Sequence, residues 1–153
     1  MKTRIAGLSD IPRIRTLYRQ QFDAMSELQP YFMQPGEQSE AFIRYMVADE
    51  RSDILLLDAE GALLGLCVIQ EKEMPGLPFF VPRRYAYIMD LLIDRDNRHV
   101  GFGTSLMTAA KSWARARSLE YLDLDVLANN DRALHFYEKM GFEMKRHNMY
   151  LRL

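Results

Sequence analysis

Hydrophobic residues recur at helical spacing in four stretches of the chain, and polar residues fill the positions between them. The first stretch follows Asp10 and Pro12, which are typical of a helix start, and ends before the two prolines of 29–36. The last begins at Asn130, a residue type that caps helices, and closes at Gly141. The four amphipathic helices that these patterns predict cover 10–28, 37–49, 101–119 and 130–140.

Shorter runs between these helices have the apolar or alternating character of β-strands. Two of them are separated only by Ala59-Glu60-Gly61, which predicts an antiparallel hairpin, and 71–84 is a long connection with three prolines. The predicted strands cover 3–6, 53–58, 62–70, 85–94 and 121–127, with one or two more within 142–153. The order of strands and helices predicts a mixed α/β sheet protein. No repeat or linker divides it, so we expect a single domain over residues 1–153.

Composition narrows the classes of function. The 153 residues are 48% hydrophobic and 27% charged, which is typical of one compact globular domain. The 20 basic and 21 acidic residues leave a net charge of −1, so neither nucleic acid nor an anionic membrane is an expected partner. Cys67 is the only cysteine and lies in an apolar run, which favours a reducing compartment. Without a secretory signal or an apolar stretch of about 20 residues, we expect a cytoplasmic protein.

A glycine-containing segment, 98–104, lies between an apolar strand and an amphipathic helix. Unpaired N–H groups at the start of a helix attract anions, and glycine lets a phosphate approach the backbone. A plain tight turn would have the same sequence. A Walker loop would need a lysine before Thr104-Ser105, and a dinucleotide fingerprint would need a small residue at Leu106, although Asp123 and Asp125 are well spaced for a ribose. A nucleotide-binding domain therefore fits less well than another phosphate ligand.

Two blocks together resemble the GNAT superfamily of N-acetyltransferases. The first is Arg98-x-x-Gly101-x-Gly103 after the strand 88–94, and the second is 130–142, in which an asparagine precedes a helix that carries Tyr137 and ends at Gly-Phe. The resemblance is strong over 85–142 and loose over 1–73. It implies a twisted sheet of six or seven strands with helices on both faces, which splays between strands 4 and 5 to admit acetyl-CoA.

The same resemblance implies which residues contact the cosubstrate. The backbone of Leu91, Leu92 and Ile93 would pair with the pantetheine arm, and Asn130 would hydrogen-bond to it in addition to capping its helix. The pyrophosphate would be held by Arg98, His99, Val100, Gly101, Phe102, Gly103 and Thr104.

Acetyl transfer needs a neutral amine, donors for the developing oxyanion and a proton for the departing thiolate. Tyr137 matches the family's tyrosine and is the candidate general acid, although a core aromatic would occupy the same position on a helix face. A backbone N–H near Leu92 is the candidate oxyanion donor. Asp90, inside an apolar strand, and Asp125, where the protein N-terminal branch places a glutamate, are candidate bases, with a salt bridge or a solvated position as plainer interpretations. Met89 departs from the acidic pair of the polyamine branch.

The resemblance predicts an enzyme that moves an acetyl group from acetyl-CoA to a primary amine on a small molecule. Acetylation of a protein N-terminus or lysine, or a non-catalytic acyl-CoA-binding module, remain alternatives. His135 and His147 lack a Cys/His cluster, so no metal is expected. The alternation of 147–153 suits an edge strand through which a homodimer could form. Aromatic residues that could line an acceptor pocket are Phe22, Tyr31, Phe32, Phe79 and Phe80.

Overall fold

A computed structural model describes residues 1–98 and 101–153 of the protein, so the predicted cofactor contacts His99 and Val100 lie outside the described residues. Within these ranges five strands form one sheet in the order β1-β2-β3-β4-β5. The first four are antiparallel neighbours and β5 runs parallel to β4, which confirms the mixed sheet. The strands are β1 (Lys2–Ile5), β2 (Ser52–Ala59), β3 (Ala62–Glu73), β4 (Arg84–Ile93) and β5 (Leu122–Leu124).

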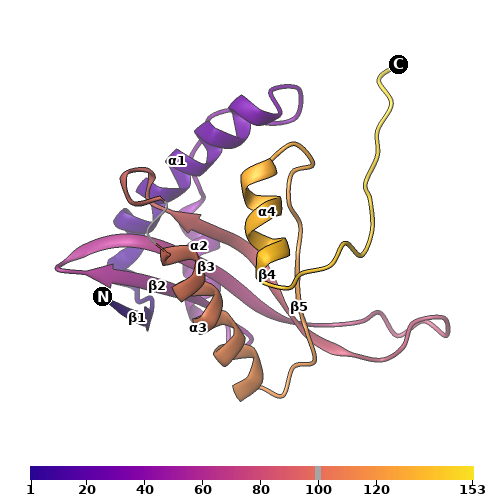
Figure 1. Ribbon diagram of the computed structural model, residues 1–153. Coiled ribbons are helices and arrows are strands. Elements are labelled where there is room, and N and C mark those ends of the chain that lie inside the picture. Colours follow the sequence, from indigo (N-terminus) through magenta and orange to yellow (C-terminus); the bar gives the residue numbers. More distant parts are fainter. Residues whose placement is uncertain (99–100) are drawn as a thin grey trace.

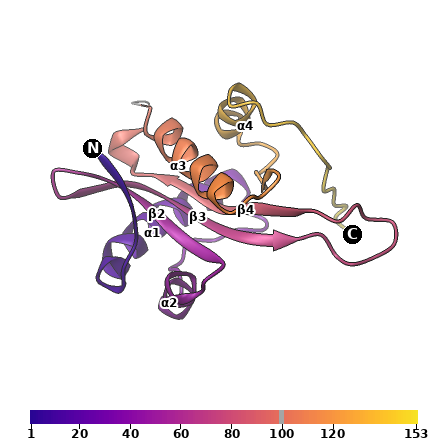
Figure 2. The same cartoon turned by 90° about the horizontal axis from the view of Figure 1, so that it is seen from below.

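Helices cover both faces of the sheet, as the sequence predicts. Helices α1 (Ile11–Leu28) and α2 (Glu40–Ala48) lie on one face, and α3 (Phe102–Ala116) and α4 (Asp131–Lys139) lie on the other (Figures 1 and 2). Two short 3-10 helices, Leu8–Asp10 and Arg95–Asn97, precede α1 and follow β4. The sheet is therefore the middle layer of three.

Each face of the sheet has its own hydrophobic core. Leu66 and Val68 of β3 pack toward α1 and α2, whereas Cys67 and Ile69 pack toward α3. Because both faces of β3 are covered, its sequence is an almost continuous apolar run instead of an alternating one. Burial raises the pKa of the Cys67 thiol, which keeps it protonated and unreactive.

Strand β4 contains a bulge and then loses one of its neighbours. Val68 of β3 is opposite Asp90, but the next residue of β3 is opposite Ile88, so Met89 is an extra residue in β4. On its other side β4 pairs with β5 only through Ala86 to Ile88, and the last five residues of β4 have no partner there. This unpaired stretch confirms the predicted splay between the fourth and fifth strands.

The prediction of six or seven strands is wrong, because the C-terminal residues form none. Strand β5 covers three residues instead of the predicted 121–127, and 142–153 runs away from the sheet as an extended segment (Figure 1). A strand needs an edge with which to pair, and β5 leaves β4 too early to offer a long one. We call residues 143–153 the C-terminal arm.

Candidate functional site

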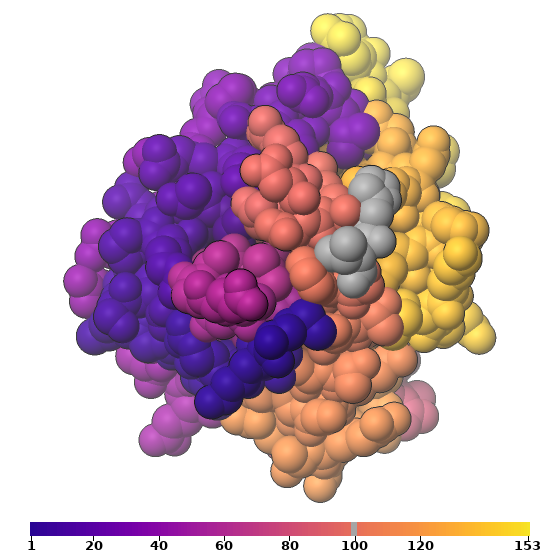
Figure 3. All heavy atoms as spheres, turned by 60° about the vertical axis from the view of Figure 1, so that its left-hand side comes forward, coloured from indigo at the N-terminus to yellow at the C-terminus, as the bar shows by residue number. Residues whose placement is uncertain are grey.

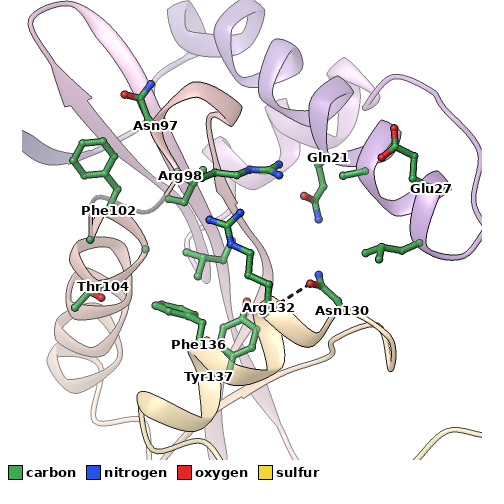
Figure 4. A pocket seen from close by; sticks show the side chains of 17 residues that line it. Gln21, Glu27, Asn97, Arg98, Phe102, Thr104, Asn130, Arg132, Phe136 and Tyr137 are labelled. Carbon is green, nitrogen blue, oxygen red and sulfur yellow. Dashed lines mark hydrogen bonds between the residues drawn. The ribbon is translucent and has the colours of Figure 1, made fainter.

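A cavity of about 570 Å³ opens where β4 and β5 separate. Its walls are the second half of α1, the end of β4, the start of α3 and the start of α4 (Figure 4). The cavity brings together predicted site residues from three separate parts of the chain. These are Leu91, Ile93, Arg98, Gly101, Phe102, Gly103, Thr104, Asn130 and Tyr137.

The start of α3 forms one end of the cavity. Gly101 precedes the helix with a φ of 79°, a left-handed conformation that favours glycine. The first helical hydrogen bond runs from the Ser105 N–H to the Gly101 carbonyl, so the N–H groups of 102–104 have no acceptor within the helix. At Gly103 a Cβ atom would lie 3.2 Å from the Phe136 ring, so this glycine also lets α4 pack closely on α3. The helix start thus presents unpaired donors beside the cavity.

Two arginines lie beside these donors. The side chains of Arg98 and Arg132 both point into the cavity (Figure 4). Burial and the nearby charges of Arg132 and Arg95 lower the pKa of Arg98. Like charges that converge on one cavity are stabilised by an anion between them, so this end of the cavity is suited to a phosphate group. Arg132 was missed in the sequence, where its position two residues after Asn130 was the only available signal.

The free edge of β4 supplies further donors. The Asp94 N–H donates to the Leu64 carbonyl of β3 at 2.9 Å. Because backbone N–H groups alternate sides along a strand, that of Leu92 also points toward β3, while those of Leu91 and Ile93 point into the gap beside β5. The N–H groups near Leu92 that face the gap are therefore those of its two neighbours, and the role of oxyanion donor stays a prediction.

Tyr137 lies on α4 and lines the cavity. Its ring makes edge contacts with Phe136 and Phe142 at centroid distances of 5.3 and 5.5 Å. Burial, with smaller effects from Cys67 and Asp90, raises the pKa of the Tyr137 hydroxyl well above its ordinary value. Because its pKa is raised, this hydroxyl carries a proton at neutral pH. It has no hydrogen-bond partner in the described part of the chain, so it is free to donate to a ligand.

Asp90 lies on the opposite face of the sheet, outside the cavity lining. The bulge at Met89 places Met89 and Asp90 toward α1 together, and the Tyr18 hydroxyl donates to the Asp90 carboxylate at 2.6 Å. Burial raises the pKa of Asp90 to about 6, although the bond from Tyr18 acts in the other direction. Such a carboxylate is ionised at neutral pH but accepts a proton more readily than an exposed one.

The other predicted polar residues have simple partners. Asp125 is exposed, lies outside the cavity lining and accepts from the Tyr87 hydroxyl at 3.0 Å. The Asn130 side chain accepts from the Ala133 N–H at 3.2 Å, which confirms that it caps α4. Its contact with a ligand stays a prediction.

The predicted aromatic pocket is wrong, because its members lie in three places. Phe22 packs beside Tyr18 at 5.6 Å, and Phe79 and Phe80 contact each other in the loop between β3 and β4. Tyr31 and Phe32 follow α1 and contact the C-terminal arm. Burial of Phe22 follows its helical spacing, whereas the loop rings have no neighbouring element that could cover them.

Residues 1–98 and 101–153 contain neither a metal-binding cluster nor a membrane-spanning helix. No group of three or more His, Cys, Asp or Glu residues is arranged to hold a metal ion. None of the described helices is both long and apolar enough to span a membrane.

The chain belongs to the acetyltransferase (GNAT) family, whose sequence profile matches residues 11–142. An uncharacterized N-acetyltransferase of Methanocaldococcus jannaschii is 23% identical over 124 residues, which are 81% of this chain and 54% of that protein. The chain thus spans about half the length of that relative. The uncharacterized N-acetyltransferase YhfO of Bacillus subtilis is 27% identical over 146 residues, 94% of this chain and 90% of that protein.

Solved structures share the fold. A tetramutant of the BH1408 protein of Bacillus halodurans is 26% identical with a TM-score of 0.95, and the match covers all of both chains. An aminoglycoside acetyltransferase from an uncultured soil metagenomic sample has a TM-score of 0.74 at 19% identity, over 99% of this chain and 95% of that one. The second likeness shows the fold alone.

Proposed function

We propose that this chain is an N-acetyltransferase that moves an acetyl group from acetyl-CoA to a primary amine on a small molecule. The observation that carries the proposal is the cavity itself. It joins the unpaired donors and two arginines at the start of α3 to the free edge of β4 and the Tyr137 hydroxyl. The GNAT family generally uses acetyl-CoA, and these three features suit its phosphates, its pantetheine amides and its thioester, respectively.

In this proposal each wall of the cavity binds one part of the cosubstrate. The N–H groups of 102–104, with Arg98 and Arg132, bind the pyrophosphate, because helix N-termini and guanidinium groups both stabilise phosphate charge. The free edge of β4 at Leu91 and Ile93 pairs with the pantetheine arm as a further strand would. Asn130 keeps donor atoms that its capping bond does not use.

The proposed reaction is a direct displacement. The amine nitrogen attacks the thioester carbon, the carbonyl oxygen becomes an oxyanion beside the β4 N–H groups, and the carbon–sulfur bond then breaks. The ammonium of the intermediate loses its proton to a base, and the departed thiolate takes a proton from solvent. Because the pKa of Tyr137 is raised above that of a thiol, about 8.5, its hydroxyl helps the sulfur leave mainly by donating a hydrogen bond.

Asp90 is the favoured base in this scheme. Its pKa of about 6 leaves it ionised at neutral pH and able to accept a proton from the acceptor amine. Asp125 is the second candidate, but it is exposed and already accepts from Tyr87. Neither carboxylate lines the cavity, so a water molecule would have to link either one to the acceptor.

The small-molecule acceptor is supported by the size of the cavity and by the structural neighbours. One of them is an aminoglycoside acetyltransferase solved in complex with sisomicin. A protein N-terminus or a lysine is the alternative acceptor, since an open cavity between helices also admits an extended peptide. A non-catalytic acyl-CoA-binding module is the second alternative, and the free hydroxyl of Tyr137 favours the enzyme over it.

Two experiments test the proposal. Acetyl-CoA at 100 times its dissociation constant should stabilise the fold by about 2.7 kcal/mol, which a thermal-shift assay detects. A panel of amines, assayed for acetyl-CoA-dependent release of free thiol, should then identify an acceptor. No melting shift at millimolar acetyl-CoA would overturn the assignment, whereas a shift without any turnover would favour the non-catalytic module.

A further inference from the structure

One side chain of α1 forms a bridge to the turn that follows β4. The Gln20 amide nitrogen donates to the Asp94 carboxylate at 3.0 Å, and the Gln20 carbonyl oxygen accepts from the Arg95 backbone N–H at 2.9 Å. Gln20 and Asp94 are 74 positions apart in the sequence, and Figure 3 shows the segment after β4 lying against α1 at the surface. The two hydrogen bonds therefore tie α1 to the end of β4.

The orientation of the Gln20 amide is fixed by its partners. A backbone N–H can only donate and an ionised carboxylate can only accept, so the amide oxygen faces Arg95 and the amide NH2 group faces Asp94. Gln20 is half-buried, which limits competition from water for both bonds. A side chain in this place thus needs one donor and one acceptor on the same planar group.

Asp94 in turn organises the residues that lead to Arg98. Its second carboxylate oxygen accepts from the Asn97 side-chain amide at 2.8 Å and from the Asp96 N–H at 3.3 Å. Burial acts to raise the pKa of Asp94, but the bond from Gln20, these two bonds and the charge of Arg98 together lower it below its ordinary value. The carboxylate is therefore ionised at neutral pH and able to accept all of these bonds.

The bridge joins two walls of the cavity. Asn97 and Arg98 line it at the end of the turn, and Gln21, the neighbour of Gln20, lines it from α1 (Figure 4). The Arg98 side chain points into the cavity beside that of Arg132. Because two guanidinium groups repel each other, a restraint from elsewhere is needed to keep Arg98 in this position when no anion lies between them.

We propose that Gln20 is a positioning residue for acetyl-CoA, which holds the turn after β4 so that Arg98 points into the cavity before the phosphates bind. The inference rests on the proposed function, because it concerns the same cosubstrate site. Gln20 does not line the cavity, so it acts through the turn and not by touching the ligand. A preformed site binds more tightly, because binding does not have to order it.

The size of the effect follows from the two hydrogen bonds. One such bond changes an equilibrium by roughly two- to tenfold, and the apparent dissociation constant rises as the fraction of molecules with the turn in place falls. Gln20→Met keeps the length of the side chain and loses both bonds. We expect it to weaken acetyl-CoA binding about three- to tenfold and to raise the KM for acetyl-CoA equally, with kcat at saturating acetyl-CoA unchanged.

A reciprocal exchange of the two side chains tests the bridge. Gln20→Glu alone places two carboxylates side by side and should weaken acetyl-CoA binding at least as much as Gln20→Met does. Adding Asp94→Asn restores the pairing, because the new amide NH2 group donates to the new carboxylate while its oxygen still accepts from Asn97. The double variant should bind acetyl-CoA within about twofold of the unmodified chain. A double variant as weak as Gln20→Glu alone would overturn the inference.

A double-mutant cycle with Arg98 separates positioning from general damage to the fold. If Gln20 acts through Arg98, Gln20→Met should have almost no further effect on acetyl-CoA affinity once Arg98→Ala is present, whereas independent effects add. Thr16→Met is the matched control, because Thr16 is exposed one turn earlier on α1 and its hydroxyl donates to the Pro12 carbonyl of the same helix. This control should bind acetyl-CoA normally. Additive losses, or an equal loss in Thr16→Met, would count against positioning by Gln20.

Failure of this inference and failure of the proposed function give different results. Hydrogen exchange of the Arg95 backbone amide in the unliganded chain reports on the bridge alone, and it should be about two- to tenfold faster in Gln20→Met than in Thr16→Met. An equal exchange rate in these two variants would show that Gln20 does not hold the turn. If the unmodified chain does not bind acetyl-CoA, the proposed function is wrong, and the exchange rate still decides whether the bridge holds.

Discussion

Tyr137 is the residue on which the proposed chemistry depends most. Tyr137→Phe keeps the ring that packs between Phe136 and Phe142 and removes only the hydroxyl. Because the hydroxyl donates a hydrogen bond to the departing sulfur, and a hydrogen bond to a charged group contributes about 1.5–3 kcal/mol, we expect kcat to fall at least about tenfold, with acetyl-CoA affinity within a few-fold. Steady-state rates, once an acceptor is known, and acetyl-CoA titrations check this. Full turnover with a rate-limiting chemical step would reduce Tyr137 to a packing residue.

Asp90 gives a prediction about stability and pH. Its pKa is raised from 3.8 to about 6 in the folded chain, so folding binds the proton more tightly. The contribution of the Asp90 carboxyl group to the stability of the fold is fully present below about pH 4, and it is lost as pH rises through about 6. Asp90→Asn keeps an oxygen for the Tyr18 hydroxyl and cannot ionise. We therefore expect Asp90→Asn to be about 1–3 kcal/mol more stable at pH 8 and equally stable at pH 3.5.

Denaturant unfolding of both proteins across this pH range measures the difference, and Asp125→Asn is a suitable control because Asp125 is exposed. A carboxylate kept at a cost to stability is typical of a functional group. If Asp90→Asn is less stable at pH 8, the ionised carboxylate is structural and its role as a base loses its support.

Single residues were predictable where spacing alone defines their role. Asn130 caps α4 and Gly141, just past the end of α4, has a positive φ of 89°, and both follow from local rules about helix ends. The bond between Tyr18 and Asp90 joins residues 72 positions apart, and no local pattern marks it. Arg132 likewise lies beside Arg98 only because α4 returns to the start of α3.

At the scale of elements, the bulge in β4 shapes both sides of the sheet. It turns Met89 and Asp90 to the α1 face while Leu91 and Ile93 keep their place beside the gap. The hydrophobic pattern of 85–94 predicts a strand but cannot show a bulge, because a bulge depends on the register with β3. For the same reason the hydrophobic pattern alone does not show which N–H groups near Leu92 face the gap.

The start of α3 supports a prediction about anions. Arg98→Ala and Arg132→Ala should each weaken acetyl-CoA binding about five- to thirtyfold, because each removes a charge-assisted contact to phosphate worth about 1–2 kcal/mol. Raising the salt concentration should reduce the difference in acetyl-CoA affinity between each variant and the unmodified chain, because salt screens the lost charge. Isothermal titration at two salt concentrations measures both effects.

Arg115→Ala is the control, since Arg115 is exposed in the last turn of α3, at the end far from the cavity and outside its lining. Unchanged affinity in both cavity variants would place the phosphates elsewhere. Loss of affinity in Arg98→Ala alone would mean that Arg132 is not part of the phosphate site.

Over the whole molecule, the sequence predicted the layers better than the edges. Helix periodicity and buried strands follow from which residues face a core, so four helices and the first four strands lie close to their predicted ranges. The C-terminal residues alternate as an edge strand would, yet in the described chain they pair with no strand. Alternation shows that a segment is able to pair, whereas pairing itself requires a partner of sufficient length.

The C-terminal arm leads to a prediction about self-association. Met149 and Leu151 are 88% and 83% exposed, and covering an apolar side chain of this size contributes about 1.5–3 kcal/mol. Phe79, at 76% exposure in the loop between β3 and β4, is a second exposed apolar residue. We expect the full chain to dimerise at high micromolar concentration through the arm.

Sedimentation velocity over a range of concentrations measures this, and the double substitution of Met149→Ser and Leu151→Ser should leave a monomer. Neither substituted residue packs in the described cores, so the melting temperature of this variant should stay within about 2 °C of that of the unmodified chain. A full chain that sediments only as a monomer at high micromolar concentration would show that these exposed side chains do not form an interface between two copies.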